Sequence, residues 1–139
     1  MLGVAVVGCG LVSKVHFDAL KKMESEGLVR LEATCDVIQE RAENAGRQYG
    51  FKWHTVNYKD IIECKDVDAV WVLLPVGIHC KVSKDLMNAG KHVLIEKPMA
   101  LNPEECNEMI DSMKRNNVAV SYTHLRAHET RHDLVCRLL

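Results

Sequence analysis

Two stretches of the sequence hold residues whose types and spacing could do chemistry. The first is Gly8-Cys9-Gly10-Leu11-Val12-Ser13, which matches the pattern G-x-G-x-x-G except that Ser13 replaces the third glycine. In this pattern the first glycine permits a tight turn and the second lets the backbone approach a pyrophosphate. The third position needs a small side chain, which serine provides. The second stretch is His128-Glu129-Thr130-Arg131-His132, an H-E-x-x-H string.

The glycine loop has a matching acid further along the chain. Asp36 follows an alternating segment, 29–35, and lies 26 residues after Gly10. A carboxylate there can bond the ribose hydroxyls of adenosine and would repel the extra phosphate of NADP, so the pattern favours NAD, with NADP as the alternative. The cofactor-binding residues expected here are Gly8, Cys9, Gly10, Leu11, Val12 and Asp36. The other interpretation is a structural glycine turn and a surface aspartate that caps a helix.

The H-E-x-x-H string is typical of a zinc hydrolase, because its two histidines lie one helical turn apart and its glutamate can act as a base. His124 adds a third histidine at the same spacing. Seven residues follow His132, which leaves no room for a distant third ligand or a cleft. We therefore predict no metal site, and consider adventitious metal binding by the three histidines as the alternative.

The composition is that of one globular domain. The chain has 139 residues, of which 47% are hydrophobic and 27% charged, and its net charge of -1 favours neither nucleic acid nor a membrane surface as a partner. No apolar run reaches the roughly 18 residues that span a bilayer, and the N-terminus lacks the pattern of a signal peptide. The six cysteines form no C-x-x-C pair. We expect a cytoplasmic protein with reduced cysteines.

Strand-like and helix-like segments alternate along the chain. The predicted strands are 4–7, 29–35, 53–56, 67–74, 92–95 and one that begins at Val118. The predicted helices are 11–23, 40–49, 60–63, 78–89 and 103–116. Such alternation predicts an α/β fold with parallel strands joined by crossover helices, and the nearly continuous apolar run at 67–74 predicts a sheet covered on both faces. The beginning of the chain favours the doubly wound, Rossmann-type fold.

Four stretches in order give a more specific match. They are Gly8-Cys9-Gly10, Cys35-Asp36, the run 67–75 followed by His79, and Gly90-Lys91-His92-Val93-Leu94-Ile95-Glu96-Lys97-Pro98. Together they resemble the N-terminal NAD(P)-binding domain of the Gfo/Idh/MocA oxidoreductases, which include inositol and sugar dehydrogenases. The resemblance covers residue 1 to about residue 118. This sequence departs from the family at Leu74, where many members have threonine, and at Val76, where asparagine is common.

The resemblance implies a role for the residues after the strand at 92–95. Lys97 would be the catalytic lysine beside the nicotinamide, where it orients or polarises the reacting hydroxyl or carbonyl and also contacts the cofactor. Pro98 would hold Lys97 in an extended backbone and so fix its direction. Glu96 would contact the nicotinamide ribose or only orient the loop.

The resemblance also places residues that follow the strand at 67–74. Leu74 and Pro75, with Val76, would pass beside the cofactor. His79 would line the cofactor site or merely cap the helix that it begins. Elsewhere, the expected packing or surface residues are His16, His54, Met87, Met109 and Met113, the three methionines being core residues.

The chemistry implied is hydride transfer between the nicotinamide and a carbinol or carbonyl carbon of a small-molecule substrate such as a sugar or an inositol. In the family a second α+β domain supplies the substrate pocket and most of the homo-oligomer interface, so we expect this truncated chain to be inactive alone. The alternative function is a non-catalytic dinucleotide-binding regulatory module.

The last residues suggest a different origin for the end of the chain. Back-translated, Ser121 to Thr130 and Leu134 to Leu139 resemble two parts of one sequencing adapter in a single frame, and the three residues between them fit a variable index. We therefore predict an NAD(P)-binding domain at 1–118 and a non-native tail at 119–139. Resequencing of the gene tests this prediction, since a genomic template that encodes the tail would contradict it.

Overall fold

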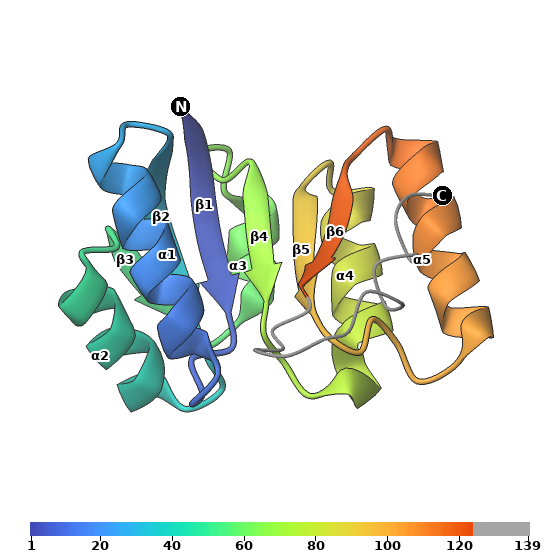
Figure 1. Cartoon of the computed structure of the whole chain (residues 1–139), viewed down its shortest axis with the longest axis horizontal. Coiled ribbons are helices and arrows are strands. Elements are labelled where there is room, and N and C mark those ends of the chain that lie inside the picture. The colour runs from blue at the N-terminus through green and yellow to red at the C-terminus, as the bar shows by residue number, and fades with distance from the viewer. Residues whose placement is uncertain (124–139) are drawn as a thin grey trace, which may run out of the picture.

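A computed structural model describes residues 1–123, and Figure 1 labels its helices and strands. The strands are β1 (Leu2–Val7), β2 (Val29–Cys35), β3 (Trp53–Thr55), β4 (Ala69–Val72), β5 (His92–Glu96) and β6 (Val120–Thr123). The helices are α1 (Ser13–Ser25), α2 (Gln39–Tyr49), α3 (Tyr58–Glu63), α4 (His79–Asn88) and α5 (Pro103–Asn116), and a 3-10 helix, η1 (Val76–Ile78), precedes α4. The predicted alternation of strands and helices is confirmed.

The six strands form one sheet in the order β3-β2-β1-β4-β5-β6. All five strand pairings are parallel, so every strand ends at the same edge, the lower one in Figure 1. This is the strand order of the doubly wound dinucleotide-binding fold, and the order reverses between β1 and β4. Ligands of such sheets bind outside the carboxyl ends of the strands at the point of reversal.

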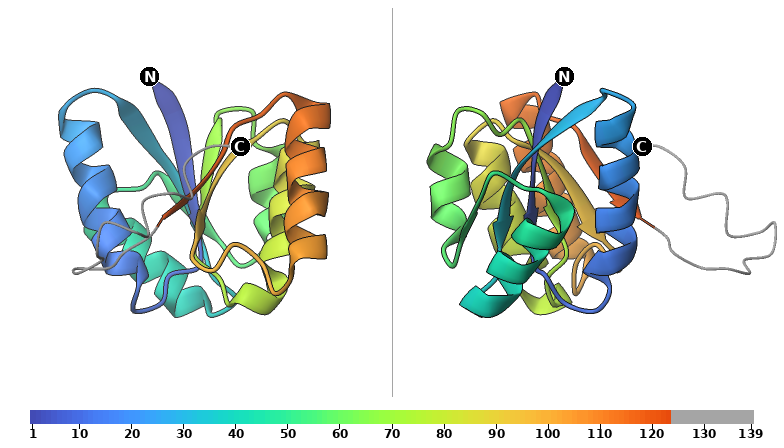
Figure 2. Two further views of the ribbon diagram at one scale, coloured as in Figure 1. Left: turned by 45° about the vertical axis from the view of Figure 1, so that its right-hand side comes forward. Right: turned by 90° about the vertical axis from the view of Figure 1, so that its left-hand side faces the viewer.

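Helices cover the sheet in two layers, as Figure 2 shows. Side chains alternate along β1, so that Val4 and Val6 pack in one apolar cluster and Ala5 and Val7 in another. The first cluster includes residues of α1 and α2, namely Phe17, Leu20 and Tyr49. The second includes residues of α3, α4 and α5, namely Ile61, Leu86, Met87 and Met109, with Met113 packed against it. The prediction of core residues is confirmed for Met87 and Met109, which are fully buried, whereas Met113 is partly buried and packs against the core.

Local signals mark the ends of α2 and α4 and the start of α5, within one residue of the predicted positions. Gly50 follows α2 with φ of 83°, a left-handed conformation that costs glycine little. Gly90 follows α4 in a similar conformation, with φ of 78°. Asn102 caps α5, because its side-chain oxygen accepts a hydrogen bond from the backbone N–H of Glu105 at 2.8 Å.

The strand predicted at 67–74 is shorter in the structure, where β4 spans Ala69–Val72. Its neighbour β5 pairs only with these four residues. Val67 is buried before the strand begins, and its carbonyl oxygen accepts a hydrogen bond from Lys91 Nζ at 2.8 Å. Leu73 and Leu74 are half-buried beyond its carboxyl end. The apolar run is therefore longer than the strand because residues at both its ends also pack in or against the core.

The predicted domain boundary after residue 118 falls between α5 and β6. In the structure β6 pairs with β5, so that Val120 lies opposite Val93. His124, His128 and His132 lie outside the described residues, as does most of the predicted tail, and the non-native origin of 119–139 stays a prediction. Within residues 1–123, no helix is long and apolar enough to cross a membrane.

Candidate functional site

The predicted site residues come together at the carboxyl edge of the sheet. The glycine loop follows β1, Asp36 follows β2, Leu74 and Pro75 come after β4, and Lys97 follows β5. Because these strands are neighbours in the order β2-β1-β4-β5, their end loops are neighbours too. We call this set of loops the crevice loops.

Gly8 and Gly10 stand in different surroundings. Gly8 is buried and has a φ of 102°, and a Cβ at this position would lie 2.4 Å from the carbonyl oxygen of Leu73. Close packing against the loop after β4 therefore requires glycine here. Gly10 is exposed, and a Cβ there would meet no protein atom within 4 Å. The fold explains Gly8, whereas the open space at Gly10 suits the close approach of a ligand.

The start of α1 is left open to an anion. Its N-cap residue, Val12, makes no side-chain cap bond, and the first turn has no acidic residue. Among residues 1–123, no partner accepts a hydrogen bond from the amide N–H of Leu11 or Val12. Free N–H groups and the partial positive charge of a helix start attract phosphate. Ser13, at the third position of the motif, is buried and its hydroxyl donates to the carbonyl oxygen of Gly10.

Asp36 joins the ends of β1 and β2. One carboxylate oxygen accepts a hydrogen bond from the amide N–H of Cys9 at 2.8 Å, and the other accepts one from Ile38 at 2.9 Å. The residue is 8% exposed, and α2 has no side-chain cap bond, so Asp36 is neither on the surface nor the cap of that helix. A carboxylate has about four lone-pair positions, so ribose hydroxyls can still bond to it.

Two thiols beside this carboxylate are held in the protonated form. Burial, and after it the negative charge of Asp36, raises the pKa of the Cys9 thiol to about 12. Burial and Asp36, in the same order of importance, also raise the pKa of Cys35 to about 12. Neither thiol is therefore suited to act as a nucleophile near neutral pH.

The loop after β4 is tied to the loop after β5 by His79. This residue is 1% exposed and is the first residue of α4. Its Nε2 lies 2.5 Å from the carbonyl oxygen of Leu74, and its Nδ1 lies 3.0 Å from that of Pro98. Both ring nitrogens thus face backbone oxygens, and Pro75 and Lys97 remain exposed in the two loops that the ring joins.

Glu96, unlike Lys97, is buried. Its Oε2 accepts a hydrogen bond from the amide N–H of Lys97 at 2.6 Å, and its Oε1 lies 3.3 Å from Nε2 of His16. His16, from α1, is 5% exposed. The sequence treats His16 as an ordinary packing residue, and no local pattern in it indicates a partner 80 residues away.

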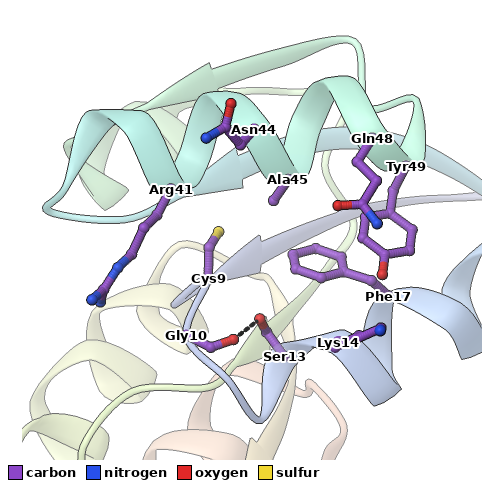
Figure 3. Close-up of a pocket in the computed structure, with 10 residues that line it drawn as sticks. All are labelled: Cys9, Gly10, Ser13, Lys14, Phe17, Arg41, Asn44, Ala45, Gln48 and Tyr49. Carbon is purple, nitrogen blue, oxygen red and sulfur yellow. Dashed lines mark hydrogen bonds between the residues drawn. The ribbon is translucent and has the colours of Figure 1, made fainter.

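A groove of about 320 Å³ lies between α1 and α2 and adjoins the glycine loop (Figure 3). Cys9, Gly10 and Ser13 line one part of it, and Lys14 and Arg41 bring two positive charges. Its lining includes no residue from the loops after β4 and β5. The groove therefore flanks the crevice loops and adds positive charge beside the expected pyrophosphate position.

These features fit a dinucleotide. Gly10 leaves room for the pyrophosphate, the start of α1 offers free N–H groups, and Asp36 can accept from a ribose hydroxyl. Large apolar side chains are exposed in the glycine loop and beside Asp36, since Leu11 is 99% and Val37 is 87% exposed. Within residues 1–123, no group of three or more His, Cys, Asp or Glu residues could hold a metal ion.

Comparison with known proteins agrees with this geometry. Residues 2–124 match a family model described as an oxidoreductase family with an NAD-binding Rossmann fold. The chain is 30% identical over 122 residues to levoglucosan dehydrogenase of Pseudarthrobacter phenanthrenivorans, covering 84% of this chain and 31% of that protein. It is 31% identical over 116 residues to inositol 2-dehydrogenase of Salmonella typhimurium, covering 83% of this chain and 34% of that protein.

A solved structure supports the same relationship. Levoglucosan dehydrogenase in complex with NADH and L-sorbose superposes with a TM-score of 0.79 at 29% identity, covering 86% of this chain and 34% of that chain. The chain thus spans about a third of the length of the relatives that it matches.

Proposed function

Because the chain belongs to the Gfo/Idh/MocA family of oxidoreductases, we propose that it is the dinucleotide-binding part of an NAD-dependent dehydrogenase. The enzyme would transfer hydride to or from a sugar, an inositol or a related hydroxyl or carbonyl compound. The observation that carries this proposal is the open space at Gly10 in front of an uncapped helix, with Asp36 on the neighbouring strand.

Each part of the dinucleotide has a counterpart in the crevice loops. The pyrophosphate would lie against Gly10, with Cys9, Leu11 and Val12 beside it, and the adenosine ribose would bond to Asp36. The nicotinamide end would lie beside Leu74, Pro75 and Lys97. Bound NAD would supply the hydride acceptor, and the protein would supply orientation and charge.

The cofactor preference follows from Asp36. Its carboxylate would stand close to the extra phosphate that NADP has on the adenosine ribose, and like charges repel in a partly buried site. Arg41 and Lys14 line the groove beside the loop and could offset part of this repulsion. We therefore propose a preference for NAD, with weaker binding of NADP.

Lys97 would act on the substrate. Its side chain is exposed, and within residues 1–123 no carboxylate forms an ion pair with its ammonium group. A free ammonium can donate a hydrogen bond to the substrate oxygen and hold the proton that moves as the carbon is oxidised or reduced. A regulatory module has no need of such a group. We propose that residues outside this chain complete the substrate pocket, so that this chain binds dinucleotide without turnover.

Titration with NADH, NADPH and ADP-ribose tests the proposal. We expect NADH to bind more tightly than NADPH, and Gly10→Ala to weaken NADH and ADP-ribose alike by roughly tenfold, which corresponds to about 1.4 kcal/mol. Gly77→Ala is a matched control, because a Cβ there also meets no atom within 4 Å. It lies outside the glycine loop and should leave ADP-ribose affinity unchanged. Absence of NADH binding to the unmodified chain would contradict the proposal.

A further inference from the structure

Buried histidines from the two helical layers hold the turn Glu96–Pro98, which we call the lysine turn. His16 comes from α1 and His79 from α4, and these helices cover opposite faces of the sheet (Figures 1 and 2). We propose that His16 and His79 are positioning residues that set the direction of the Lys97 side chain. The proposal rests on the proposed function, because that function gives Lys97 a substrate to act on.

His16 acts on the turn through Glu96. The Glu96 carboxylate has one oxygen beside His16 Nε2, at 3.3 Å, and the other on the amide N–H of Lys97, at 2.6 Å. His16 and Glu96 are only 5% and 7% exposed, so neither can exchange its partner for water without cost. The contact between them fixes the carboxylate, and the carboxylate fixes the backbone from which the Lys97 side chain projects.

His79 acts on the other end of the turn. Its ring lies between the carbonyl oxygens of Leu74 and Pro98, at 2.5 Å and 3.0 Å. A neutral imidazole donates to one of them and an imidazolium to both. The ring therefore spaces the loop after β4 from the lysine turn, and the two loops flank the proposed nicotinamide position.

The side chain of Lys97 needs such support because, within residues 1–123, no other polar contact fixes its direction. It is exposed and has no ion-pair partner within residues 1–123. Its direction therefore depends on the backbone of the lysine turn, and the polar contacts of that backbone lead to His16 through Glu96 and to His79 through Pro98. Packing of the two histidine rings in the core would not by itself bring both of them to the lysine turn.

The test uses the whole chain with ¹³C-labelled lysine, and Lys97→Arg assigns the Lys97 signal. In the unmodified protein we expect NADH to shift this signal and ADP-ribose, which lacks nicotinamide, to leave it in place. In His16→Leu and His79→Leu the NADH-specific shift should fall by half or more, while ADP-ribose affinity stays within twofold. His16→Gln and His79→Gln keep an N–H donor and should recover most of the shift. His54→Leu, at an exposed position on β3, is the matched control and should change nothing.

Different results would contradict different parts. If NADH shifts Lys97 in the leucine variants as in the unmodified protein, or if ADP-ribose affinity falls with NADH affinity, the histidines are not positioning residues. If the unmodified protein binds no NADH, the proposed function itself fails. Should a leucine variant not fold, the ring ¹⁵N signals of the unmodified protein decide. NADH, but not ADP-ribose, should shift those of His16 and His79, and unchanged ring signals would overturn the proposal.

Discussion

The candidate site runs along the carboxyl edge of the sheet from an end around Asp36 to an end around Lys97. Different contacts hold the loops at these two ends. At the first end, Asp36 accepts hydrogen bonds from backbone N–H groups of Cys9 and Ile38. At the second end, histidine rings reach the loops from helices on the two faces of the sheet. The first arrangement consists of backbone amides bonded to one carboxylate. The second consists of side-chain rings bonded to the loops, and one of its contacts, His16 with Glu96, joins residues 80 apart in the sequence.

This difference predicts how each end responds to substitution. Around Asp36 the backbone is fixed by glycine conformation and by a carboxylate that bonds to the amide N–H of Cys9, so single changes there should alter binding of the whole dinucleotide. Around Lys97 the backbone is fixed by side chains from α1 and α4, so changes there should alter only the nicotinamide end. The following experiments test the first half of this comparison, and the histidine variants described above test the second half.

The largest effect is expected for Gly8→Ala. Residue 8 has a φ of 102°, and its Cβ would lie 2.4 Å from the carbonyl oxygen of Leu73. Backbone strain and overlap should together lower the free energy of unfolding by about 2–5 kcal/mol. Thermal melting measures the loss, with Gly10→Ala as the control that keeps the native melting temperature because its Cβ enters open space. Native melting of Gly8→Ala would show that the approach to Leu73 does not constrain the loop.

A smaller effect is expected for Asp36. Asp36→Ala removes the acceptor for the amide N–H of Cys9 together with the charge, and should weaken NADH binding by roughly 10–100-fold, the range for hydrogen bonds to charged groups. Asp36→Asn keeps an acceptor oxygen and should weaken it less. Both variants should shift the preference toward NADPH, because both remove the carboxylate. Calorimetric titration measures the affinities, and tighter NADPH than NADH binding in the unmodified protein would contradict the assigned role.

A substitution at Glu32 tests whether a change in stability alone alters NADH binding. Glu32 lies on β2, the strand that ends directly before Asp36, and is 2% exposed. Burial opposes its ionisation, but hydrogen bonds from Lys52 and Arg30 outweigh burial and lower its pKa. The stabilisation is therefore present above the ordinary glutamate value of about 4.3 and is lost as the pH falls through the lower folded value.

The melting temperature of the unmodified protein should thus fall by several degrees as the pH drops below about 4.3, and that of Glu32→Gln should fall less. Melting curves across this range measure the difference. At neutral pH, Glu32→Gln should bind NADH as the unmodified protein does. Weaker binding would mean that the crevice loops respond to general stability, and the contrast between the two ends would lose its basis.

The sequence predicts the glycine-loop end better than the lysine end for a physical reason. The conformation of Gly8 and the small size required at Ser13 are local, so residue type and spacing indicate them. The fold class follows from strand and helix periodicity in the same way. Contacts such as His16 with Glu96 form only after the sheet assembles, and one sequence contains no pattern that joins them.

The limits of β4 could not be predicted for a related reason. The run from Val67 to Leu74 is apolar apart from Asp68, but only Ala69–Val72 pairs with β5. Val67 instead packs in the core, and its carbonyl accepts from Lys91. Hydrophobicity indicates burial at these positions but does not show where strand pairing begins or stops.

The smallest effect is expected at the Cys9 thiol, which reports on the Asp36 end without any ligand. With its pKa raised to about 12 by burial and by Asp36, only roughly 10⁻⁴ of this thiol is ionised at a pH of about 8, against a large fraction of an ordinary cysteine with a pKa near 8.5. Alkylation by iodoacetamide should therefore be slow in the folded protein and fast in urea. Asp36→Asn removes the neighbouring charge, and should raise the folded rate a few-fold while burial keeps it far below the urea rate.

Peptide mass spectrometry at several reaction times measures each cysteine separately. Cys64, which follows α3, is the internal control, and its rate should be the same in both proteins. Cys35 should follow Cys9, because burial and Asp36 raise its pKa in the same order. Equal Cys9 rates in the two proteins would mean that the Asp36 charge does not reach the glycine loop, and a Cys64 rate that rises with them would point to loosening of the whole fold. Only a change confined to Cys9 and Cys35 would support a carboxylate that ties β1 to β2 at this end.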